Sequence, residues 1–507
     1  MRAVHIVWFK RDLRIEDHRP LMEAAAHGEV LPLYIVEPQA WRQPDASLRQ
    51  WRFVRQTLLE LDADLRALGA AGLVVRVGET CAVLAALARE FSVAGLWSHE
   101  ETGNDWSFAR DRAVLAWTKR QGVAWTEFRQ DGVLRRLNSR NGWAEHWQRF
   151  MVAALIPAPA KLEAVDAPSD HLPDERALFA DNYAQGDDCP HAQPGGRSHA
   201  LRLLHSFLHV RGKNYARGMS SPLTAESACS RLSPHIAWGA LSMREIVHAL
   251  HARQVEAPEG WGRALAAFAA RLAWQSHFMQ KLESEPRMEF ANLHPALAHE
   301  RQSVDARLLR AWSEGRTGFP LIDACMRMLH ATGWINFRMR AMLAAFACYH
   351  LWQPWREVGL HLARLFIDYE PGIHWSQMQM QSGSTGINAF RIYNPVKQSY
   401  DQDPEGVFIR RWLPELGRVP AEWVHEPWRM PAELQKTYAC SIGQDYPAPI
   451  VDHEQAARAA REKLHLAYRG DQARESSRQV MEKHGSRKRR SRAPAPAKTS
   501  AQLDLFA

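Results

Sequence analysis

The sequence predicts two folded domains: an N-terminal α/β domain built on a parallel sheet, and an all-α C-terminal domain. Short apolar runs alternate with helical patterns in the first 135 residues, which is typical of a parallel α/β sheet. Strand signals almost vanish after residue 200. The length of 507 residues also exceeds what a single hydrophobic core usually holds.

The N-terminal domain is expected to span residues 1–135. Between its apolar runs lie helical patterns such as Leu58, Leu61, Leu65 and Leu68, which share one helix face. The chain contains neither a G-x-G-x-x-G nor a P-loop motif, so the sheet itself carries no nucleotide fingerprint. The runs with the length of buried strands are 3–8, 31–36, 73–77, 94–97 and 123–128.

Residues 136–199 are rich in Pro, Asp and Gly and predict a surface connector. Helical patterns between Pro and Gly breaks predict the second domain over residues 200–470. Its clearest unit is Phe319–Thr332, which opens on a proline and ends at Gly333. We expect residues 471–507 to be a disordered basic tail, because the stretch 486–500 lacks large apolar groups.

Composition narrows the classes of protein that remain open. No apolar run has the length of a membrane helix, and the six Cys are too widely spaced for a disulfide framework or a metal site. These features predict a cytoplasmic protein without metal, and we expect a monomer. The formal charge is +8, of which +5 lies in residues 471–507, so the body shows only weak electrostatic evidence for binding nucleic acid.

Three segments of the helical domain combine polar and aromatic residues in ways that core packing does not require. They are Tyr215 with CSRLSPHIAWGALS at 229–242, GRTGFPLIDACMRMLHATGWINFRMR at 315–340, and the stretch from FIDYEPGIHW to NPVKQSYDQDPEGVFIRRWLPEL at 366–416. Together with WFKRDLRIEDHRPL at 8–21 and VGE at 77–79, these blocks resemble the DNA photolyase/cryptochrome family over roughly residues 1–465. The resemblance implies that the first domain binds an antenna chromophore, of a type the sequence does not identify, and that the second holds FAD.

The resemblance also implies which residues contact FAD. The hydroxyls of Ser230 and Ser233, and N–H groups at a helix start, suit its diphosphate, although plain helix capping would use the same residues. Arg340 and Asp368 match an Arg–carboxylate pair against the flavin ring, for which a structural ion pair is the alternative. The full set expected to bind the cofactor is Tyr215, Cys229, Ser230, Arg231, Leu232, Ser233, Gln275, Arg340, Asp368, Tyr369, Glu370 and His374.

Trp274 and Trp334 match the aromatic residues that contact a flipped pyrimidine dimer in relatives, and large rings stack well on an extruded base. The alternative is that each is a core residue. Arg338 fits a phosphate contact, and Arg271 and Phe337 complete the expected DNA-binding set. Repair by this family would make Trp274, Trp334 and His374 the catalytic candidates.

Several positions depart from the family pattern. Arg271 stands where repair-competent relatives commonly carry a Glu, and His374 stands where they carry an Asn, so an imidazole could titrate near neutral pH beside the flavin. Of the three Trp that commonly supply electrons, only the middle position, Trp355, is retained. The other two positions hold Met378 and Gln302, and Met380 replaces a further aromatic, so Trp352, Trp375 and Tyr369 are candidates for a substitute route.

The last residues predict a partner. Gln502, Leu503, Asp504, Leu505 and Phe506 resemble the short peptide with which bacterial DNA-metabolism proteins dock on the polymerase sliding clamp. Two Leu and a Phe can fill an apolar groove while a disordered leash gives reach. A random apolar terminus is the alternative, and the basic cluster at 487–492 could add nonspecific DNA affinity.

These observations leave three functions open. The first is light-driven repair of pyrimidine photoproducts in DNA by electron transfer from reduced FAD. The second is a cryptochrome-like blue-light photoreceptor, favoured by Arg271, His374, Met378 and Met380. The third is a flavin electron-transfer protein that does not depend on light.

Overall fold

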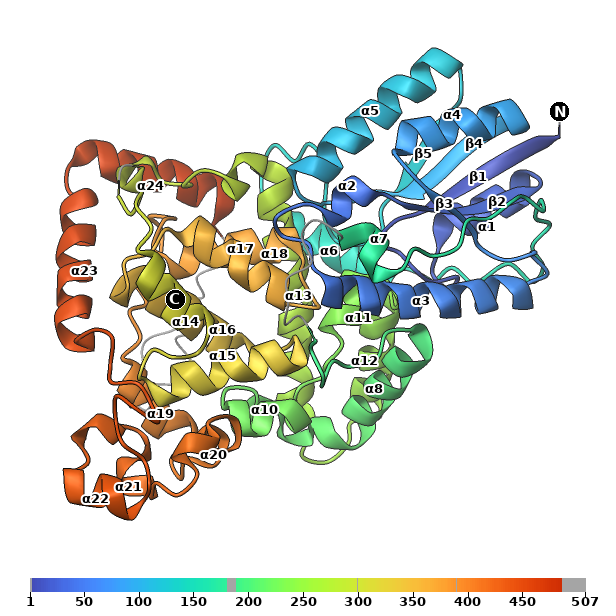
Figure 1. Ribbon diagram of the computed structural model, residues 1–507. Coiled ribbons are helices and arrows are strands. Elements are labelled where there is room, and N and C mark those ends of the chain that lie inside the picture. Colours follow the sequence, from blue (N-terminus) through green and yellow to red (C-terminus); the bar gives the residue numbers. More distant parts are fainter. Residues whose placement is uncertain (1, 180–187, 299, 389, 486–507) are drawn as a thin grey trace.

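The computed structural model describes residues 2–179, 188–298, 300–388 and 390–485. It shows a sheet domain and a larger helical domain packed side by side (Figure 1). Both expected fold classes are confirmed. None of the helices in the described part of the chain combines the length and the apolar character that crossing a membrane requires.

The sheet has five parallel strands in the order β3-β2-β1-β4-β5. Side chains of β1 alternate between two apolar clusters, with Val7 and Phe9 on the face covered by α1 and α3, and Ile6 and Trp8 on the face covered by α4 and α5. The sheet is therefore buried on both faces, which explains its continuous apolar strands. The strands are β1 (Ala3–Phe9), β2 (Val30–Val36), β3 (Val74–Val77), β4 (Ser92–His99) and β5 (Trp125–Phe128). The helices of this domain are α1 (Arg19–His27), α2 (Pro38–Trp41), α3 (Leu48–Ala67), α4 (Thr80–Glu90) and α5 (Asp105–Gln121).

The loop after β1 is held by a buried cluster at its base. The Asp12 carboxylate lies 2.9 Å from Nε2 of His18 and 2.7 Å from Nδ1 of His99. Nδ1 of His18 accepts from the Leu21 N–H, so the His18 proton is on Nε2 and donates to Asp12. This cluster orients the loop that carries Arg11 toward the helical domain.

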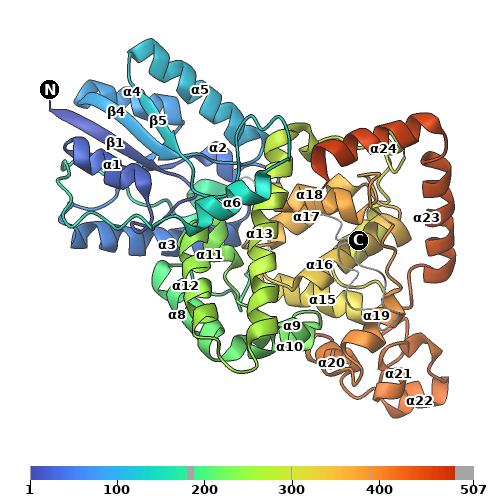
Figure 2. The same ribbon diagram turned by 180° about the vertical axis from the view of Figure 1, so that it is seen from behind.

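Residues 136–199 are more structured than the connector that the sequence predicts. They contain α6 (Trp143–Val152) and α7 (Glu175–Phe179). Leu162 and Val165 are buried in the clusters of the sheet domain, because Ala164 bridges Val30 beside β2. Figure 2 shows α6 crossing the boundary of the two domains, beside α12 and α13.

The helical domain packs around a large apolar cluster that includes Trp312, Trp375 and Tyr446. The predicted unit at 319–332 is α15 (Pro320–Thr332), and Gly333 ends it in the left-handed conformation at φ 66°. The helices before α15 are α8 (Arg197–His209), α9 (Tyr215–Gly218), α10 (Pro222–Ala228), α11 (Ser233–Ala237), α12 (Met243–Val255), α13 (Gly262–Ser284) and α14 (Ala306–Ser313). Those after it are α16 (Phe337–Ala345), α17 (Trp355–Leu365), α18 (Pro371–Gln381), α19 (Pro395–Gln402), α20 (Val407–Trp412), α21 (Ala421–Val424), α22 (Ala432–Thr437), α23 (His453–Ala467) and α24 (Asp471–His484). Short 3₁₀ turns are η1 (Arg211–Asn214), η2 (Pro286–Glu289), η3 (Pro295–Leu297), η5 (Pro414–Leu416) and η6 (Pro427–Arg429), and η4 (Phe346–His350) is a π-helical turn.

The prediction that the whole stretch 471–507 is disordered is wrong for its first part. Residues 471–484 form α24. Its Val480 packs in the large apolar cluster of the helical domain, and its Lys483 forms an ion pair with Glu285. His294 adds a 3.0 Å contact to the Ala473 carbonyl. Composition missed this helix because its few anchoring residues are spread over a polar sequence. The rest of the expected tail, including 502–506, lies outside the described residues.

The two domains meet closely along α11. A Cβ on Gly239 (φ +72°) would lie 2.3 Å from the Arg11 carbonyl oxygen, so this contact requires glycine. The side chain of Gln50, on α3, donates to the carbonyls of Ala363 and Phe366. The sheet domain therefore positions the segment that follows α17.

Candidate functional site

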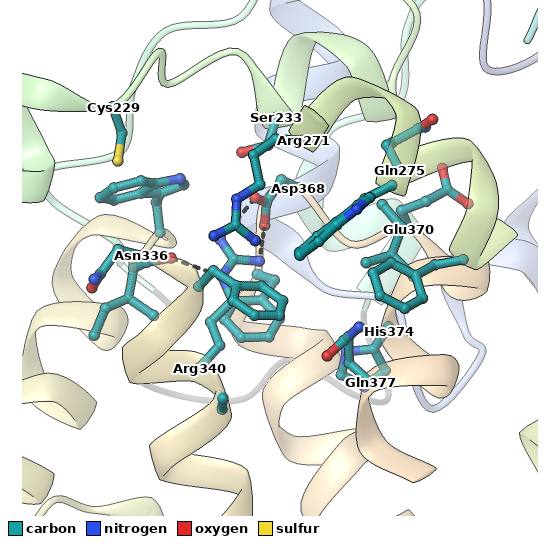
Figure 3. Close-up of a pocket in the computed structure, with 18 of the residues that line it drawn as sticks. Cys229, Ser233, Arg271, Gln275, Asn336, Arg340, Asp368, Glu370, His374 and Gln377 are labelled. Carbon is teal, nitrogen blue, oxygen red and sulfur yellow. Dashed lines mark hydrogen bonds and ion pairs between the residues drawn. The ribbon is translucent and has the colours of Figure 1, made fainter. Parts of the chain in front are cut away.

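A cavity of about 310 Å³ opens in the helical domain. Its walls are α13, α16, α18, the loop before α11, and residues 366–370 (Figure 3). Helices α13 and α18 pack closely against each other. A Cβ on Gly372 would lie only 2.6 Å from Cα of Met279, so the approach needs glycine at this position. Most of the lining is apolar or aromatic, with a small number of polar groups between.

Arg340 and Asp368 form a bidentate pair at the wall of this cavity. The two distances are 3.0 and 2.8 Å, and the guanidinium also donates to the Ile335 carbonyl at 2.7 Å. Arg340 lies over the ring of Phe366 at 4.1 Å. The planar group is thus fixed in orientation, with 24% of its side chain still accessible.

The segment that carries Asp368 is held from the sheet domain. Nε1 of Trp238 donates to the Ile367 carbonyl at 2.9 Å, and Arg11 donates to the Tyr369 carbonyl at 2.6 Å. The Tyr369 hydroxyl donates to Asp45 at 2.6 Å. Two contacts from the sheet domain, those of Arg11 and Asp45, and one from Trp238 beside α11 therefore determine where the acidic residues of the cavity lie.

Glu370 follows this segment and caps α18. Burial raises its pKa to about 7, and the Arg11 guanidinium, 3.6 Å away, opposes that rise. Its Oε1 has no hydrogen-bond partner among the described residues. Glu370 is thus a buried carboxyl with a raised pKa and an acceptor oxygen that no described residue bonds to.

His374 lies on α18 with its ring against Tyr369 and Trp375. Nε2 is 2.9 Å from the Gly359 carbonyl, so it carries the proton and donates. Burial lowers the pKa of His374 to about 4. This lowered pKa argues against the expectation that the imidazole titrates near neutral pH, because desolvation outweighs the hydrogen bond to Gly359 and the Asp368 charge, which both raise the pKa. Among the residues of the cavity wall, it is the Glu370 carboxyl whose pKa is near neutral.

The loop at 229–233 is shaped by backbone contacts. Arg211 donates to the carbonyls of Cys229 and Ser230. Arg231 adopts φ 63°, and its guanidinium lies 4.1 Å from the Trp334 ring. The predicted helix start is real but short, since α11 has five residues beginning at Ser233. The hydroxyl of Ser230 accepts from the N–H of Leu232 at 3.4 Å, a turn contact just before the helix, and no side chain caps α11.

Aromatic and cationic groups alternate around the rest of the cavity. Arg271 lies 4.5 Å from the Trp274 ring and 5.4 Å from the Phe337 ring. Trp274 is partly exposed, whereas Trp334 is buried at 5%. The Nε atom of Arg338 has no partner among the described residues. The lining therefore offers flat rings together with positive charge.

Most of the predicted site residues meet at this cavity, whereas Leu232 and Trp355 lie outside its lining. Trp355 instead packs against Trp375 with ring centroids 6.0 Å apart, and Trp375 lies 4.9 Å from His374. Met378 lines the cavity, and Gln302 is exposed. The predicted residues that line the cavity are Tyr215, Cys229, Ser230, Arg231, Ser233, Arg271, Trp274, Gln275, Trp334, Phe337, Arg338, Arg340, Asp368, Tyr369, Glu370 and His374.

The predicted set lacks four polar residues of the lining: Ser220, and three whose side chains carry an amide. Asn336 precedes α16, and Gln377 and Gln381 lie on α18. The two glutamines follow His374 at i+3 and i+7, a spacing that places them on one helix face and could have revealed them. Each of the three has a buried polar atom without a partner in the described chain. These atoms suit a cofactor that combines flat apolar rings with polar edges, as FAD does.

A second, smaller cavity of about 120 Å³ lies at the carboxyl ends of β1 and β2. It is next to the point between β1 and β4 where the strand order reverses, the usual ligand crevice of such sheets. Arg110 crosses its wall, 3.0 Å from Glu37 and 2.6 Å from Glu101. The fold thus provides a crevice in each domain.

Comparisons with known proteins agree with this architecture. Residues 5–141 match the family model described as DNA photolyase, and residues 268–466 match the FAD binding domain of DNA photolyase. Cryptochrome-1 of Arabidopsis thaliana is 28% identical over 90% of this chain and 70% of its own. The deoxyribodipyrimidine photo-lyase of Alkalihalophilus pseudofirmus is 28% identical over 90% of this chain and 97% of its own.

Solved structures extend the likeness to three dimensions. A bacterial class III photolyase from Agrobacterium tumefaciens superposes with a TM-score of 0.82 at 26% identity, covering 92% of this chain and 98% of its own. An archaeal photolyase from Sulfolobus tokodaii, whose structure holds two FAD molecules, gives 0.74 at 25% identity over 91% and 100%. The two matched models, the sheet domain and the helical domain with its cavity together show that the chain belongs to the DNA photolyase/cryptochrome family and that its helical domain is an FAD-binding domain.

Proposed function

We propose that this chain repairs pyrimidine photoproducts in DNA under blue light. The observation that carries the proposal is the arrangement of Trp274, Trp334 and Arg338 at the wall of the cavity that holds Arg340 and Asp368. Flat rings beside positive charge suit a base that has left the duplex and the phosphates next to it. FAD, when bound, supplies light absorption and electron donation.

The residues of the chain would divide the remaining work. Arg340 and Asp368 would orient the flavin ring, and the unpartnered atoms of Asn336, Gln377 and Gln381 would satisfy its polar edges. Trp274 and Trp334 would contact the extruded bases, with Arg338 on a phosphate. Loss of either Trp should therefore affect repair more than cofactor binding.

The test uses purified flavin-containing protein and oligonucleotides that carry either a cyclobutane dimer or a 6-4 product. We expect lesion loss in blue light and none in darkness. Trp274→Ala should lower repair while the flavin-to-protein ratio is kept. Trp423→Ala, on α21 away from the cavity, is the matched control. A wild-type protein that takes up flavin, is photoreduced and repairs neither lesion would contradict the proposal.

That last outcome would favour a second function, a cryptochrome-like photoreceptor. Met378 supports it, because a thioether lines the cavity where relatives commonly supply electrons through an indole. Arg271 supports it as well, since a cation stands where repair-competent relatives carry an acceptor. The same assay therefore separates the two candidates.

The crevice of the sheet domain is the proposed site of an antenna chromophore. Its place at the carboxyl ends of β1 and β2 supports this, as does the rim of rings at Trp8, Tyr34 and Trp106. Absorbance of the pigments released by denaturing the purified protein tests it. Release of FAD alone, at one equivalent per chain, would contradict it.

We propose further that the segment Gln502–Phe506 binds the polymerase sliding clamp; it lies outside the described residues. Deleting residues 502–507 should abolish retention on immobilised clamp and leave flavin content unchanged. A variant with the same five residues in scrambled order is the control for composition. Equal retention of the wild type and the deletion would rule the partner out.

A further inference from the structure

A third cavity, of about 220 Å³, lies far from the flavin site and the sheet. It is formed by the π-helical turn η4, by α23, and by residues 392–394 (α23 is at the edge of the molecule in Figure 1). A π-turn inserts one residue into a helix and often marks a functional position. No function discussed above uses this place.

His350, the last residue of η4, lies at the base of this cavity. It is 5% exposed, and neither of its ring nitrogens has a hydrogen-bond partner in the described part of the chain. Its ring stacks on Phe346 at 5.1 Å, which fixes the direction of the nitrogens. A buried, unpartnered imidazole costs free energy unless something in the cavity bonds to it.

The opposite wall comes from one face of α23. His453, Ala457, Arg458 and Arg461 follow at spacings that share this face, and Glu454 is the acidic member. Both arginines are exposed, and the Asp452 carboxylate, which caps α23 outside the cavity lining, interacts with the Arg458 charge. Two guanidinium groups face one carboxylate, so the cavity carries a net positive charge even with both histidines neutral.

We propose that this cavity binds a small oxyanion of the phosphate type, with His350 at its base and Arg458 and Arg461 at its mouth. The N–H of His350, the two guanidinium groups and the Asn394 amide are donors, and Arg groups bind tetrahedral oxyanions through paired N–H bonds.

Protonation of His350 should follow occupancy. Burial, then His453 and Arg461, lower the pKa of His350 to about 4, so the empty site holds a neutral ring at pH 7. An anion bound between His350 and Arg461 would attract the protonated imidazole and outweigh its repulsion by the positive charges, so the pKa of His350 would rise. The bound site then takes up a proton, and affinity increases as the pH falls from 7 toward 5. The polar groups that line the cavity with His350 are His453, Glu454, Arg458 and Arg461 on α23, with Tyr393 and Asn394.

The first experiment measures inorganic phosphate binding to flavin-loaded full-length protein by calorimetry. Arg458→Gln with Arg461→Gln should weaken binding about tenfold or more, since two charge-assisted contacts are lost. Arg469→Gln with Arg474→Gln removes the same charge from exposed positions outside the cavity and should leave binding unchanged. All of these side chains are exposed, so the fold is not at risk. Equal affinity in the two double variants, or no binding to the wild type, would overturn the proposal.

The second experiment uses sulfate, which does not titrate between pH 5 and 7. We expect sulfate to bind more tightly at pH 5 than at pH 7. Binding should also take up a proton, so the measured binding enthalpy should depend on the ionisation enthalpy of the buffer. His350→Asn should remove both effects. A pH-independent affinity in the wild type would exclude His350 from the site. A selenate soak should give an anomalous peak beside His350, and a peak elsewhere would refute this location. Comparison of phosphate with a phosphate monoester then tells whether the free ion or an ester end is the better ligand.

Discussion

The Arg11 guanidinium lies 3.6 Å from the Glu370 carboxylate, so a residue of the sheet domain faces an acid that lines the main cavity of the helical domain. Arg11 also lies 4.4 Å from the Trp238 ring and donates to the Ala237 and Tyr369 carbonyls. The site is therefore a product of both domains, although its cavity lies in one.

Glu370 should make stability depend on pH. Its folded pKa of about 7 exceeds the value of about 4.3 in an unfolded chain, so the folded state holds an extra proton between these values. The contribution of the Glu370 carboxyl to the free energy of unfolding is fully present below the unfolded pKa, and it is lost as the pH rises through 7. Relative to Glu370→Gln, the wild type should lose on the order of 1–3 kcal/mol between pH 5 and 7.5. Thermal unfolding across that range measures it, with exposed Glu433→Gln as control. Parallel curves for wild type and Glu370→Gln would contradict the assignment.

Asp368→Asn should lower flavin retention. The amide keeps the volume but leaves the Arg340 charge unpaired at the cavity wall. We expect a loss of about 2–4 kcal/mol in stability, because one partner of a largely buried pair is removed. The flavin-to-protein ratio and thermal unfolding are the measurements. Glu415→Gln breaks a similar bidentate pair with Arg327 away from the cavity, and it should leave flavin content unchanged. Equal flavin loss in both variants would indicate general destabilisation instead.

His374→Asn should not alter the pH dependence of the flavin spectrum between pH 6 and 8. The imidazole is already neutral throughout that range, with its pKa lowered to about 4 by burial. Glu370→Gln should alter it, because that carboxyl titrates there. Spectrophotometric titration of the two variants is the check. A shift in His374→Asn alone would show that the imidazole does titrate near neutral pH.

Trp375→Phe should slow photoreduction of the bound flavin to a small fraction of the wild-type rate. Trp375 lies between His374 at the cavity and Trp355. Its easily oxidised indole could therefore pass the electron that Met378, at the position of the usual Trp, cannot. Trp352→Phe is the control, since Trp352 packs against a separate cluster with Tyr349 and Leu464. The rate under blue light with a thiol reductant is measured by absorbance. Equal rates in the two variants would exclude this route.

Glu285→Gln should loosen α24. His484, Lys483 and Arg287 gather at this carboxylate and lower its pKa, the His484 hydrogen bond most strongly. We expect faster proteolysis within 471–484 and a stability loss of at most about 1 kcal/mol, because the contacts are partly exposed. Glu475→Gln, which breaks an exposed pair with Arg478, should change neither. Unchanged proteolysis would mean that Val480 and the His294 contact alone hold the helix.

The sequence by itself determined the fold class, because strand and helix periods are local. The runs at 3–8 and 31–36 and the unit at 319–332 became β1, β2 and α15 with boundaries shifted by one residue at most. The pairing of Arg340 with Asp368 was implied by the resemblance to the family, and the structure shows the bidentate contact.

Tertiary structure alone decided the chemistry of the lining. Burial lowers the pKa of His374 and raises the pKa of Glu370, and Arg11, which is 359 residues away in the chain from Glu370, opposes that rise. The same holds for Trp375 beside Trp355 and for the docking of α24 on Glu285. Desolvation and long-range contacts are properties of the packed chain, so no local pattern in the sequence encodes them.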